Sequence, residues 1–270
     1  MSKLLILIFL FISMRLFADT GVLILAHGST HGQHGGHHHC HQETFPDWEK
    51  NVLNIIEEAQ NHIQYKTQVS FGMWETECID HAIDMLEAKM SPSKLDHLIV
   101  VPFYISSYSS VIEMQKYIFG LQADKPLPIP VKKSKFNKKV SYTQSIDYSD
   151  SVSNILKDRA EQLFTKSKSQ TKDNQELYLI MHGPNENISN HRWLEMGQRY
   201  ASDLSIMGFK DIKVISIRDD IDEPMRSELE EDLRENIKTT IKRKREVLLL
   251  PLLLSTNGIQ DRILKRVEGL

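Results

Sequence analysis

Two pairs of apolar segments recur in the same order along the chain, and this repeat limits the fold more than any other feature. GVLILAHG (Gly21–Gly28) resembles ELYLIMHG (Glu176–Gly183), and both runs stop at His-Gly. LIVVPFYIS (Leu98–Ser106) resembles VLLLPLLLS (Val247–Ser255), and both runs contain a proline. A repeat of this kind indicates two structural units of the same design, one in each half of the chain.

The repeated runs are predicted to be buried parallel strands. They are continuously apolar and bounded by turn residues, which is typical of strands covered on both faces. Two further runs, QVSFGM (Gln68–Met73) and KVISIRDD (Lys213–Asp220), lie between the repeated ones at corresponding places in the two halves. Each half is therefore predicted to contain at least three such strands.

Apolar residues at helical spacing separate these strands. The four sets are Val52, Ile55, Ile56, Ala59 and Ile63; Ile79, Ala82, Ile83 and Leu86; Val152, Ile155, Leu156 and Leu163; and Trp193, Met196, Tyr200, Leu204 and Met207. Alternating strands and helices form right-handed βαβ units on a parallel sheet. We therefore predict an α/β fold of two similar lobes, each a parallel sheet flanked by helices, with a cleft between them.

The lobes are predicted to span residues 19–145 and 146–270. The stretch 123–141 is rich in Pro and Lys and is predicted to be a loop that ends in a short strand near Val140. Residues 1–18 are set apart, because Lys3 precedes a short apolar run and Ala18 follows it, as in a secretory signal peptide. We expect a periplasmic or otherwise exported protein. The alternative is an uncleaved membrane anchor.

The stretch AHGSTHGQHGGHHHCHQ, residues 26–42, contains seven of the twelve histidines and one of the two cysteines. Trp48 lies 21 residues after His27, whereas Trp193 lies 11 residues after His182, so the spacing predicts a His-rich loop, 30–42, inserted into the first lobe. Interleaved glycines make a rigid site unfavourable, so we expect a loop that buffers metal. Its candidate ligands are His31, His34, His37, His38, His39 and His41. A polar loop of biased composition is the alternative.

Chemistry is expected beyond the carboxyl ends of the strands, where open parallel sheets bind ligands. His27 and His182 directly follow the first strand of each half, and Glu75, Asp219 and Asp220 follow the second strands. Imidazoles and carboxylates suit a divalent transition metal and can also accept protons. The alternatives are a simple His-Gly turn and, for Glu75, an acid at a helix N-terminus.

Polar residues also follow the third strand and the Pro- and Lys-rich stretch. Tyr108, Ser109 and Ser110 are candidate substrate-binding residues, although turn and cap chemistry explains them equally. Lys132 and Lys133 are candidate partners for substrate carboxylates, and a solvated loop is their alternative.

Other classes of protein leave no trace in the sequence. The formal net charge of −3 gives no attraction to nucleic acid. The chain has no G-x-S-x-G elbow, no P-loop and no G-x-G-x-x-G motif. Two cysteines, Cys40 and Cys78, do not make a disulfide framework, and they do not exclude an oxidising compartment.

In order and spacing, LILAHGS, VSFGM, VVPFYISSYSSVI, MHGPNEN, ISIRDD and LLLPLLLSTNGIQDRILKRVEGL together resemble the two-repeat sirohydrochlorin chelatases, over residues 21–270. The resemblance implies insertion of Co²⁺ or Fe²⁺ into sirohydrochlorin, a tetrapyrrole with eight carboxylates, bound between the lobes. It also implies that His27 and His182 act as metal ligand and proton acceptor. The family often has a second His after the third strand, where this sequence has Tyr108 and Ser110.

We therefore expect a chelatase in which Glu75 assists the two strand-end histidines, His27 being the dominant one because it adjoins the His-rich loop. The divalent metal is a substrate, and no organic cofactor is required. The alternative is an exported, non-catalytic carrier of metal or tetrapyrrole on the same fold. We expect a tetrapyrrole partner, no nucleic acid, and membrane contact only through an uncleaved signal. The oligomeric state is left open.

Overall fold

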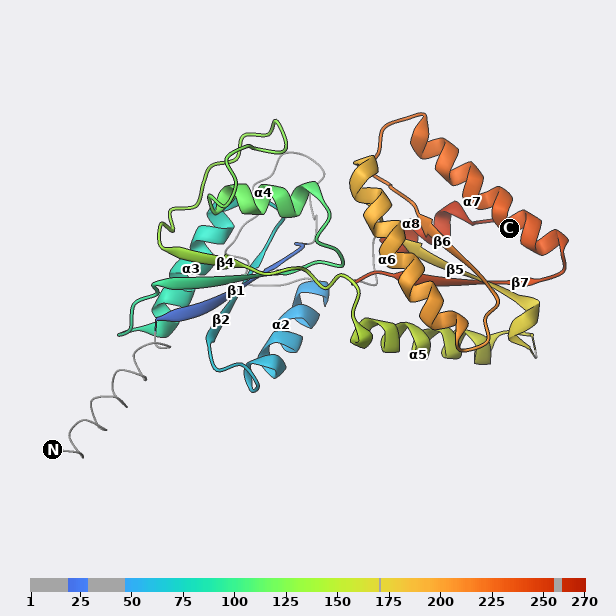
Figure 1. Cartoon of the computed structure of the whole chain (residues 1–270), viewed down its shortest axis with the longest axis horizontal. Helices are drawn as coiled ribbons and strands as arrows, with labels where there is room; N and C mark the ends of the chain where they lie inside the picture. The colour runs from blue at the N-terminus through green and yellow to red at the C-terminus, as the bar shows by residue number, and fades with distance from the viewer. Residues whose placement is uncertain (1–18, 29–46, 170, 255–258) are drawn as a thin grey trace. The chain divides into compact units, whose positions relative to one another are not determined.

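The structure is a computed structural model that describes residues 19–28, 47–169, 171–254 and 259–270 (Figure 1). The chain divides into two compact units. The first unit contains the chain up to Tyr104 together with Val111–Ser145, and the second contains Ile105–Ser110 together with Ile146–Leu270. Within the described residues, no helix is long and apolar enough to cross a membrane.

The first unit is a four-stranded parallel sheet with helices on both faces. Its elements are β1 (Thr20–Ala26), α2 (Asp47–Gln60), β2 (Lys66–Phe71), α3 (Thr76–Met90), β3 (His97–Phe103), α4 (Ser110–Ile118) and β4 (Lys139–Tyr142). The strand order is β2-β1-β3-β4. Along β1, Leu23 and Leu25 pack with α3 and α4, whereas Val22 and Ile24 pack with α2. Because successive side chains alternate between the faces, a continuously apolar strand serves both cores.

The second unit repeats this design on a three-stranded parallel sheet of order β6-β5-β7. Its elements are α5 (Asp150–Lys166), the short 3₁₀ helix η1 (Lys172–Asn174), β5 (Gln175–Met181), α6 (Asn187–Ser205), β6 (Asp211–Ser216), α7 (Met225–Lys242), β7 (Glu246–Leu252) and α8 (Ile259–Arg266). All seven residues of β5 are buried. Leu177 and Leu179 pack with α5 and α6, and Tyr178 and Ile180 pack with α7 and α8. Figure 1 shows α5 and α7 on opposite sides of this sheet.

The carboxyl ends of β5 and β7 form the topological switch point of the second sheet. The helix that follows β5, α6, covers one face, and the helix that follows β7, α8, covers the other. Chain segments therefore diverge from these two neighbouring strand ends. In open α/β sheets ligands bind at such a point, and His182 is the first residue after β5.

The two parallel sheets flanked by helices confirm the predicted fold class, but two details differ from the sequence analysis. First, α6 begins at Asn187, before the first residue of the apolar set that predicted this helix, Trp193. Second, Ile105–Ser110 belongs to the second unit and not to the N-terminal lobe. The reason is packing, because Ile105 is part of the core formed by α5, α6 and β5.

Candidate functional site

His182 lies at the carboxyl edge of the second sheet, fixed through its backbone. The N–H of Ile217 donates to the carbonyl of Met181 at 3.0 Å, and the N–H of Arg218 donates to the carbonyl of His182 at 2.7 Å. The pairing of β5 with β6 thus continues through His182. Its side chain is 28% exposed, although Nε2 itself is buried.

Gly183 turns the chain away directly after His182. Its φ is +76°, in the left-handed region. A Cβ at this position would lie 1.7 Å from Ser216 Oγ. That hydroxyl donates to Asn190 Oδ1 at 2.6 Å, so it cannot move aside without losing a hydrogen bond. The turn that presents His182 therefore requires glycine for two reasons, its conformation and its lack of a side chain.

We expect Gly183→Ala to lower the free energy of unfolding by about 3 kcal/mol or more, the sum of a left-handed residue and an overpacked contact. Gly120→Ala is the matched control, because Gly120 has φ +70° and open space around its Cβ position. The control should lose only about 1–2 kcal/mol. Denaturant unfolding followed by circular dichroism measures both. Equal losses would show that the contact with Ser216 has no cost.

A carboxylate lies beside the imidazole of His182. Asp220 Oδ2 is 3.3 Å from His182 Nε2. The orientation of the two groups does not make a hydrogen bond, and Nε2 is buried with no hydrogen-bond partner among the described residues. A buried polar atom without a partner costs free energy, and in native proteins it often marks the place of a ligand. His182 Nε2 and Asp220 therefore form the centre of the candidate site.

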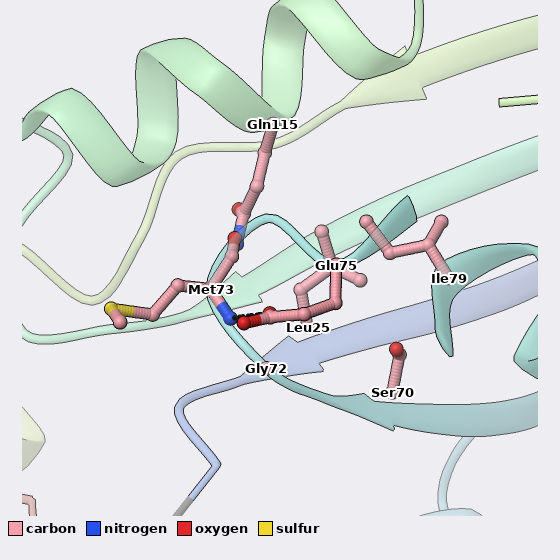
Figure 2. A pocket seen from close by; sticks show the side chains of 7 residues that line it. All are labelled: Leu25, Ser70, Gly72, Met73, Glu75, Ile79 and Gln115. Carbon is pink, nitrogen blue, oxygen red and sulfur yellow. Dashed lines mark hydrogen bonds between the residues drawn. The ribbon is translucent and has the colours of Figure 1, made fainter. Parts of the chain in front are cut away.

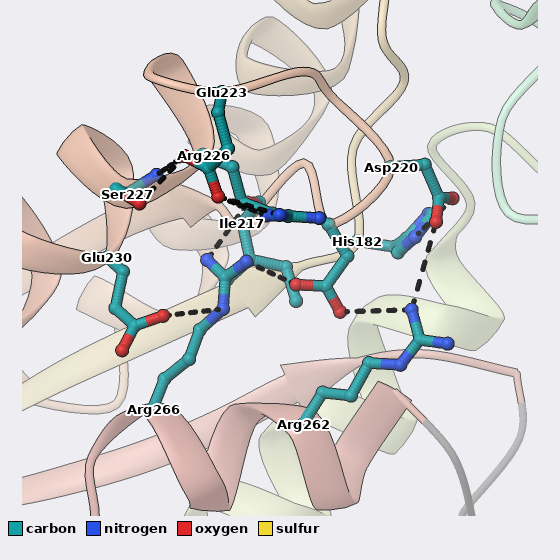
Figure 3. A network of polar contacts seen from close by, with 10 residues as sticks. His182, Ile217, Asp220, Glu223, Arg226, Ser227, Glu230, Arg262 and Arg266 are labelled. Carbon is teal, nitrogen blue, oxygen red and sulfur yellow. Dashed lines mark hydrogen bonds and ion pairs between the residues drawn. The ribbon is translucent and has the colours of Figure 1, made fainter.

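Arg262, from the first turn of α8, completes this cluster (Figure 3). Its Nη1 lies 3.4 Å from Asp219 Oδ2 and 3.7 Å from Asp220 Oδ1. The three elements that follow β5, β6 and β7 thus contribute one side chain each: His182, Asp220 and Arg262. The site occupies the switch point that the topology defines.

Arg266 and Asp219 form the buried support under these residues. Arg266 Nη2 pairs with Asp219 Oδ1, and Nη1 donates to the carbonyl of Ile217 at 3.1 Å. Glu230 lies 3.9 Å from Arg266 Nε. Buried charges persist only when they are paired in this way. Asp219 is therefore engaged in fixing α8 to the loop after β6.

Arg218 connects the loop after β6, which contains Asp220, to the loop after β5, which contains His182. Its φ is +45°. Its Nε donates to the carbonyl of Pro184 at 3.0 Å, and Nη2 donates to the carbonyl of Asn185. Burial lowers the pKa of the Arg218 guanidinium. Asn185 Nδ2 in turn donates to the carbonyl of Asp220 at 2.9 Å. These bonds hold the loops after β5 and β6 together.

In the first unit, the predicted residues His27 and Glu75 have different surroundings. His27 is exposed, and its Nδ1 lies 2.6 Å from the carbonyl of Gly28, as expected for a hydrogen bond donated by that nitrogen. Glu75 is the N-cap residue of α3. Its Oε2 accepts the N–H groups of Met73 at 2.7 Å and Trp74 at 3.0 Å. The carboxylate of Glu75 therefore organises the turn between β2 and α3.

A small hollow lies beside Glu75 (Figure 2). It is lined by Leu25, Ser70, Gly72, Met73, Glu75, Ile79 and Gln115, which leave no enclosed space for even a water molecule. Gln115 Nε2 donates to the carbonyl of Met73 at 2.9 Å and to the hydroxyl of Tyr104 at 3.0 Å. Burial raises the pKa of that hydroxyl far above its usual value, so Tyr104 keeps its proton. This hollow is too small for a macrocycle.

Tyr108, Ser109 and Ser110 belong to the segment that packs with the second unit. The backbone N–H and Oγ of Ser107 donate to the carboxylate of Asp147 at 2.8 and 2.6 Å. Trp193 Nε1 donates to the carbonyl of Tyr108 at 2.7 Å. The ring of Tyr108 remains half exposed, with the guanidinium carbon of Arg192 5.9 Å from its centre. Ser110 begins α4. The backbone of this segment is therefore fixed within the second unit.

Lys132 and Lys133 lie in the loop before β4 of the first unit. The carbonyl of Lys132 accepts the hydroxyl of Thr76 at 2.8 Å. The ammonium of Lys133 lies 5.2 Å from the ring centre of Tyr117. The structure thus places both lysines against helices of the first unit.

A resident metal site is not formed by the part of the chain that the structure describes: no group of three or more His, Cys, Asp or Glu residues there could hold a metal ion. The candidate ligands His31, His34, His37, His38, His39 and His41 lie outside the described residues. Cys78, in the first turn of α3, is buried and disulfide-bonded.

No family model and no curated protein matches the chain. One solved structure that matches is a multi-domain protein from Deinococcus radiodurans, described as structurally similar to chelatases and as having two additional novel domains. The sequences are 14% identical, with a TM-score of 0.48, over 93% of this chain and 47% of that one. The chain thus spans about half the length of the structure it matches. The fold assignment rests on the two parallel sheets and their flanking helices.

Proposed function

We propose that this protein is a chelatase that inserts a divalent metal ion into sirohydrochlorin or a similar carboxylated tetrapyrrole. The observation that carries the proposal is His182 Nε2, a buried nitrogen without a hydrogen-bond partner among the described residues. It lies beside the carboxylate of Asp220, at the switch point of the second sheet. The resemblance of the strand-end motifs to sirohydrochlorin chelatases supports the same reaction.

The two protein ligands suit a metal ion that passes on to the tetrapyrrole and does not remain bound to the protein. One imidazole and one carboxylate, His182 and Asp220, are two ligands, whereas resident sites for transition metals usually have three or four protein ligands. A two-ligand site binds weakly enough for the tetrapyrrole nitrogens to take the metal over. Nitrogen and oxygen donors of this kind suit Co²⁺ or Fe²⁺. The metal is a substrate in this proposal, and no organic cofactor takes part.

Insertion exchanges two protons for one metal ion. As the four ring nitrogens bind the metal, two pyrrole N–H bonds break and their electron pairs stay on nitrogen. In the proposed reaction His182 Nε2 holds the metal first, and once released its neutral imidazole accepts one of the two protons. Asp220, which is largely exposed, accepts the other and returns it to solvent.

This proposal assigns the principal role to the second unit, although the sequence analysis favoured His27. His182 has a neighbouring carboxylate and a neighbouring guanidinium, whereas the carboxylate of Glu75 accepts two backbone N–H groups. We propose that His27 acts together with the histidines of residues 31–41 as a store that supplies metal. Interleaved glycine and histidine suit soft, multiple binding.

We further propose that the protein works in an oxidising compartment, such as the periplasm. The signal-like residues 1–18 support export. Detection of the protein in the periplasmic fraction, with residues 1–18 removed, would test this.

The expected result of the activity test is faster insertion of Co²⁺ or Fe²⁺ into sirohydrochlorin than in the absence of protein. The protein is incubated with the tetrapyrrole and each metal near neutral pH, and the change in visible absorbance is followed. Protein boiled beforehand is the control. A rate equal to the control for every metal, together with stable binding of metal or tetrapyrrole, would contradict the enzyme and leave the non-catalytic carrier.

A further inference from the structure

Arg262 has binding capacity that the network around it does not use. A guanidinium carries five N–H donors. Both of the contacts of Arg262 with Asp219 and Asp220 come from Nη1, at 3.4 and 3.7 Å. Among the described residues, its Nε and Nη2 have neither a hydrogen-bond nor an ion-pair partner. The side chain is 52% exposed, whereas that of Arg266 is 7% exposed and paired with Asp219.

The helix holds this guanidinium in a fixed place. Ile263, the next residue of α8, is buried against Tyr178 and the helix α7. Arg266, one turn further along, is paired with Asp219. The backbone of α8 is thus anchored directly after Arg262 and again at Arg266, so that the side chain of Arg262 is presented from a packed helix.

The contacts of Arg262 also place it beside His182. Asp220 lies between them, with Oδ2 near His182 Nε2 and Oδ1 near Arg262 Nη1. The two ends of this group of three side chains therefore attract ligands of opposite charge. His182 and Asp220 attract a cation, and the Nε–Nη2 edge of Arg262 is open to an anion. Two parallel N–H groups on one edge match the two oxygens of a carboxylate.

We propose that Arg262 binds a peripheral carboxylate of the substrate through its Nε–Nη2 edge, while the metal approaches the ring from His182. This inference rests on the proposed chelatase function and deepens it, because it names the side chain that recognises the carboxylates of the substrate. Arg262 selects macrocycles that carry carboxylates at the rim. It orients such a ring relative to the imidazole and takes no part in the proton transfers.

The test compares two variants, Arg262→Gln and Arg262→Lys, with the control variant Lys265→Gln. Lys265 is an exposed residue of the same helix, and its replacement by Gln removes the same positive charge. Uroporphyrin, an octacarboxylate porphyrin, is the binding probe, and a porphyrin with four N-methylpyridinium groups is the counter-probe. Fluorescence titration without metal measures both. Arg262→Gln should weaken uroporphyrin binding about 10- to 100-fold, the size of a bidentate charge-assisted bond. Arg262→Lys should recover only part of it, and Lys265→Gln should bind nearly as the unaltered protein does.

The counter-probe should bind no more weakly to Arg262→Gln than to the unaltered protein, because it has no carboxylate. Arg262→Gln and Lys265→Gln could bind uroporphyrin with equal affinity while the unaltered protein still inserts metal. This result would overturn the role of Arg262 and leave the proposed chelatase function standing. If the unaltered protein neither binds uroporphyrin nor inserts metal, the proposed function fails, and the role of Arg262 fails with it. Unchanged thermal unfolding of the variants excludes a folding defect.

Discussion

His182→Ala is expected to lower the rate of metal insertion by about 100-fold or more at saturating metal, the usual contribution of a positioned proton acceptor. The variant loses the only imidazole that the structure places beside Asp220 within the described residues. Folding should be retained, because the side chain is partly exposed and its Nε2 has no hydrogen bond to lose. Absorbance assays of insertion, paired with circular dichroism, measure both expectations.

Two variants serve as controls for this result. His191→Ala removes an exposed imidazole of α6 that pairs with Glu195, and it should leave the rate unchanged. His27→Ala should slow insertion only at limiting metal, since we propose that His27 supplies metal. A near-normal rate for His182→Ala beside an inactive His27→Ala would return the principal role to the first unit. Near-normal rates for both would exclude the strand-end histidines from the reaction.

The strands were predictable from the sequence because burial on two faces leaves a strong local signal. The run Gly21–Gly28 corresponds to β1, and Glu176–Gly183 corresponds to β5. Three helices left a weaker signal. In α7 the fully buried positions are Leu233, Ile237 and Thr240, so the apolar stripe is narrow and most of the helix is charged. The helices α4 and α8 are short, and short periodic segments are difficult to distinguish from loops.

The candidate site could be predicted from the sequence only for the residues that directly follow strand ends. A position directly after a predicted parallel strand indicates the carboxyl edge, which is why His182 and Asp220 could be named as candidates. Arg262 could not, because its role depends on how α8 packs on the second sheet, a long-range contact with no local signature. The same holds for Arg218, whose guanidinium binds backbone carbonyls of another loop.

The segment 105–110 shows a further limit of local reasoning. Its sequence continues directly from β3, so the sequence analysis placed it with the N-terminal lobe. Its partners, Asp147 and Trp193, come later in the chain. No periodicity within the segment indicates these partners, because the contacts are single hydrogen bonds to side chains far along the chain. The packing of Ile105 in the second core and the two hydrogen bonds from Ser107 to Asp147 place the segment with the second unit.

The amino edge of the second sheet contains a buried charge cluster, far along β5 from His182. Glu176 is 2% exposed, and its Oε1 lies 2.9 Å from the ammonium of Lys213. Its Oε2 accepts the hydroxyl of Thr240 at 2.9 Å and lies 3.7 Å from Arg245 Nη1. These partners come from β6, from α7 and from the turn before β7. One carboxylate thus joins three neighbouring elements.

Glu176→Gln is expected to lower the free energy of unfolding by about 3 kcal/mol, since removing one member of a buried pair leaves the other charges uncompensated. The partners Lys213 and Arg245 are partly exposed, so the loss should lie at the lower end of the usual range. Glu161→Gln is the matched control. Glu161 pairs with Lys172 at 2.6 Å but is half exposed, so its loss should stay below about 1 kcal/mol. Denaturant unfolding at neutral pH compares the two.

The same cluster should make the stability of the second unit sensitive to acid. Burial by itself raises the pKa of Glu176, but the hydrogen bonds from Lys213 and Thr240 and the charges of Lys213 and Arg245 outweigh it, so the pKa is lowered in the folded protein. A carboxylate with a lowered pKa contributes stability that is fully present above its unfolded pKa, and that stability is lost as the pH falls through the folded pKa. The difference in unfolding free energy between the unaltered protein and Glu176→Gln should therefore be constant near neutral pH and shrink below roughly pH 4. A difference that stays constant down to pH 2 would show that the stabilisation does not depend on the charge of Glu176.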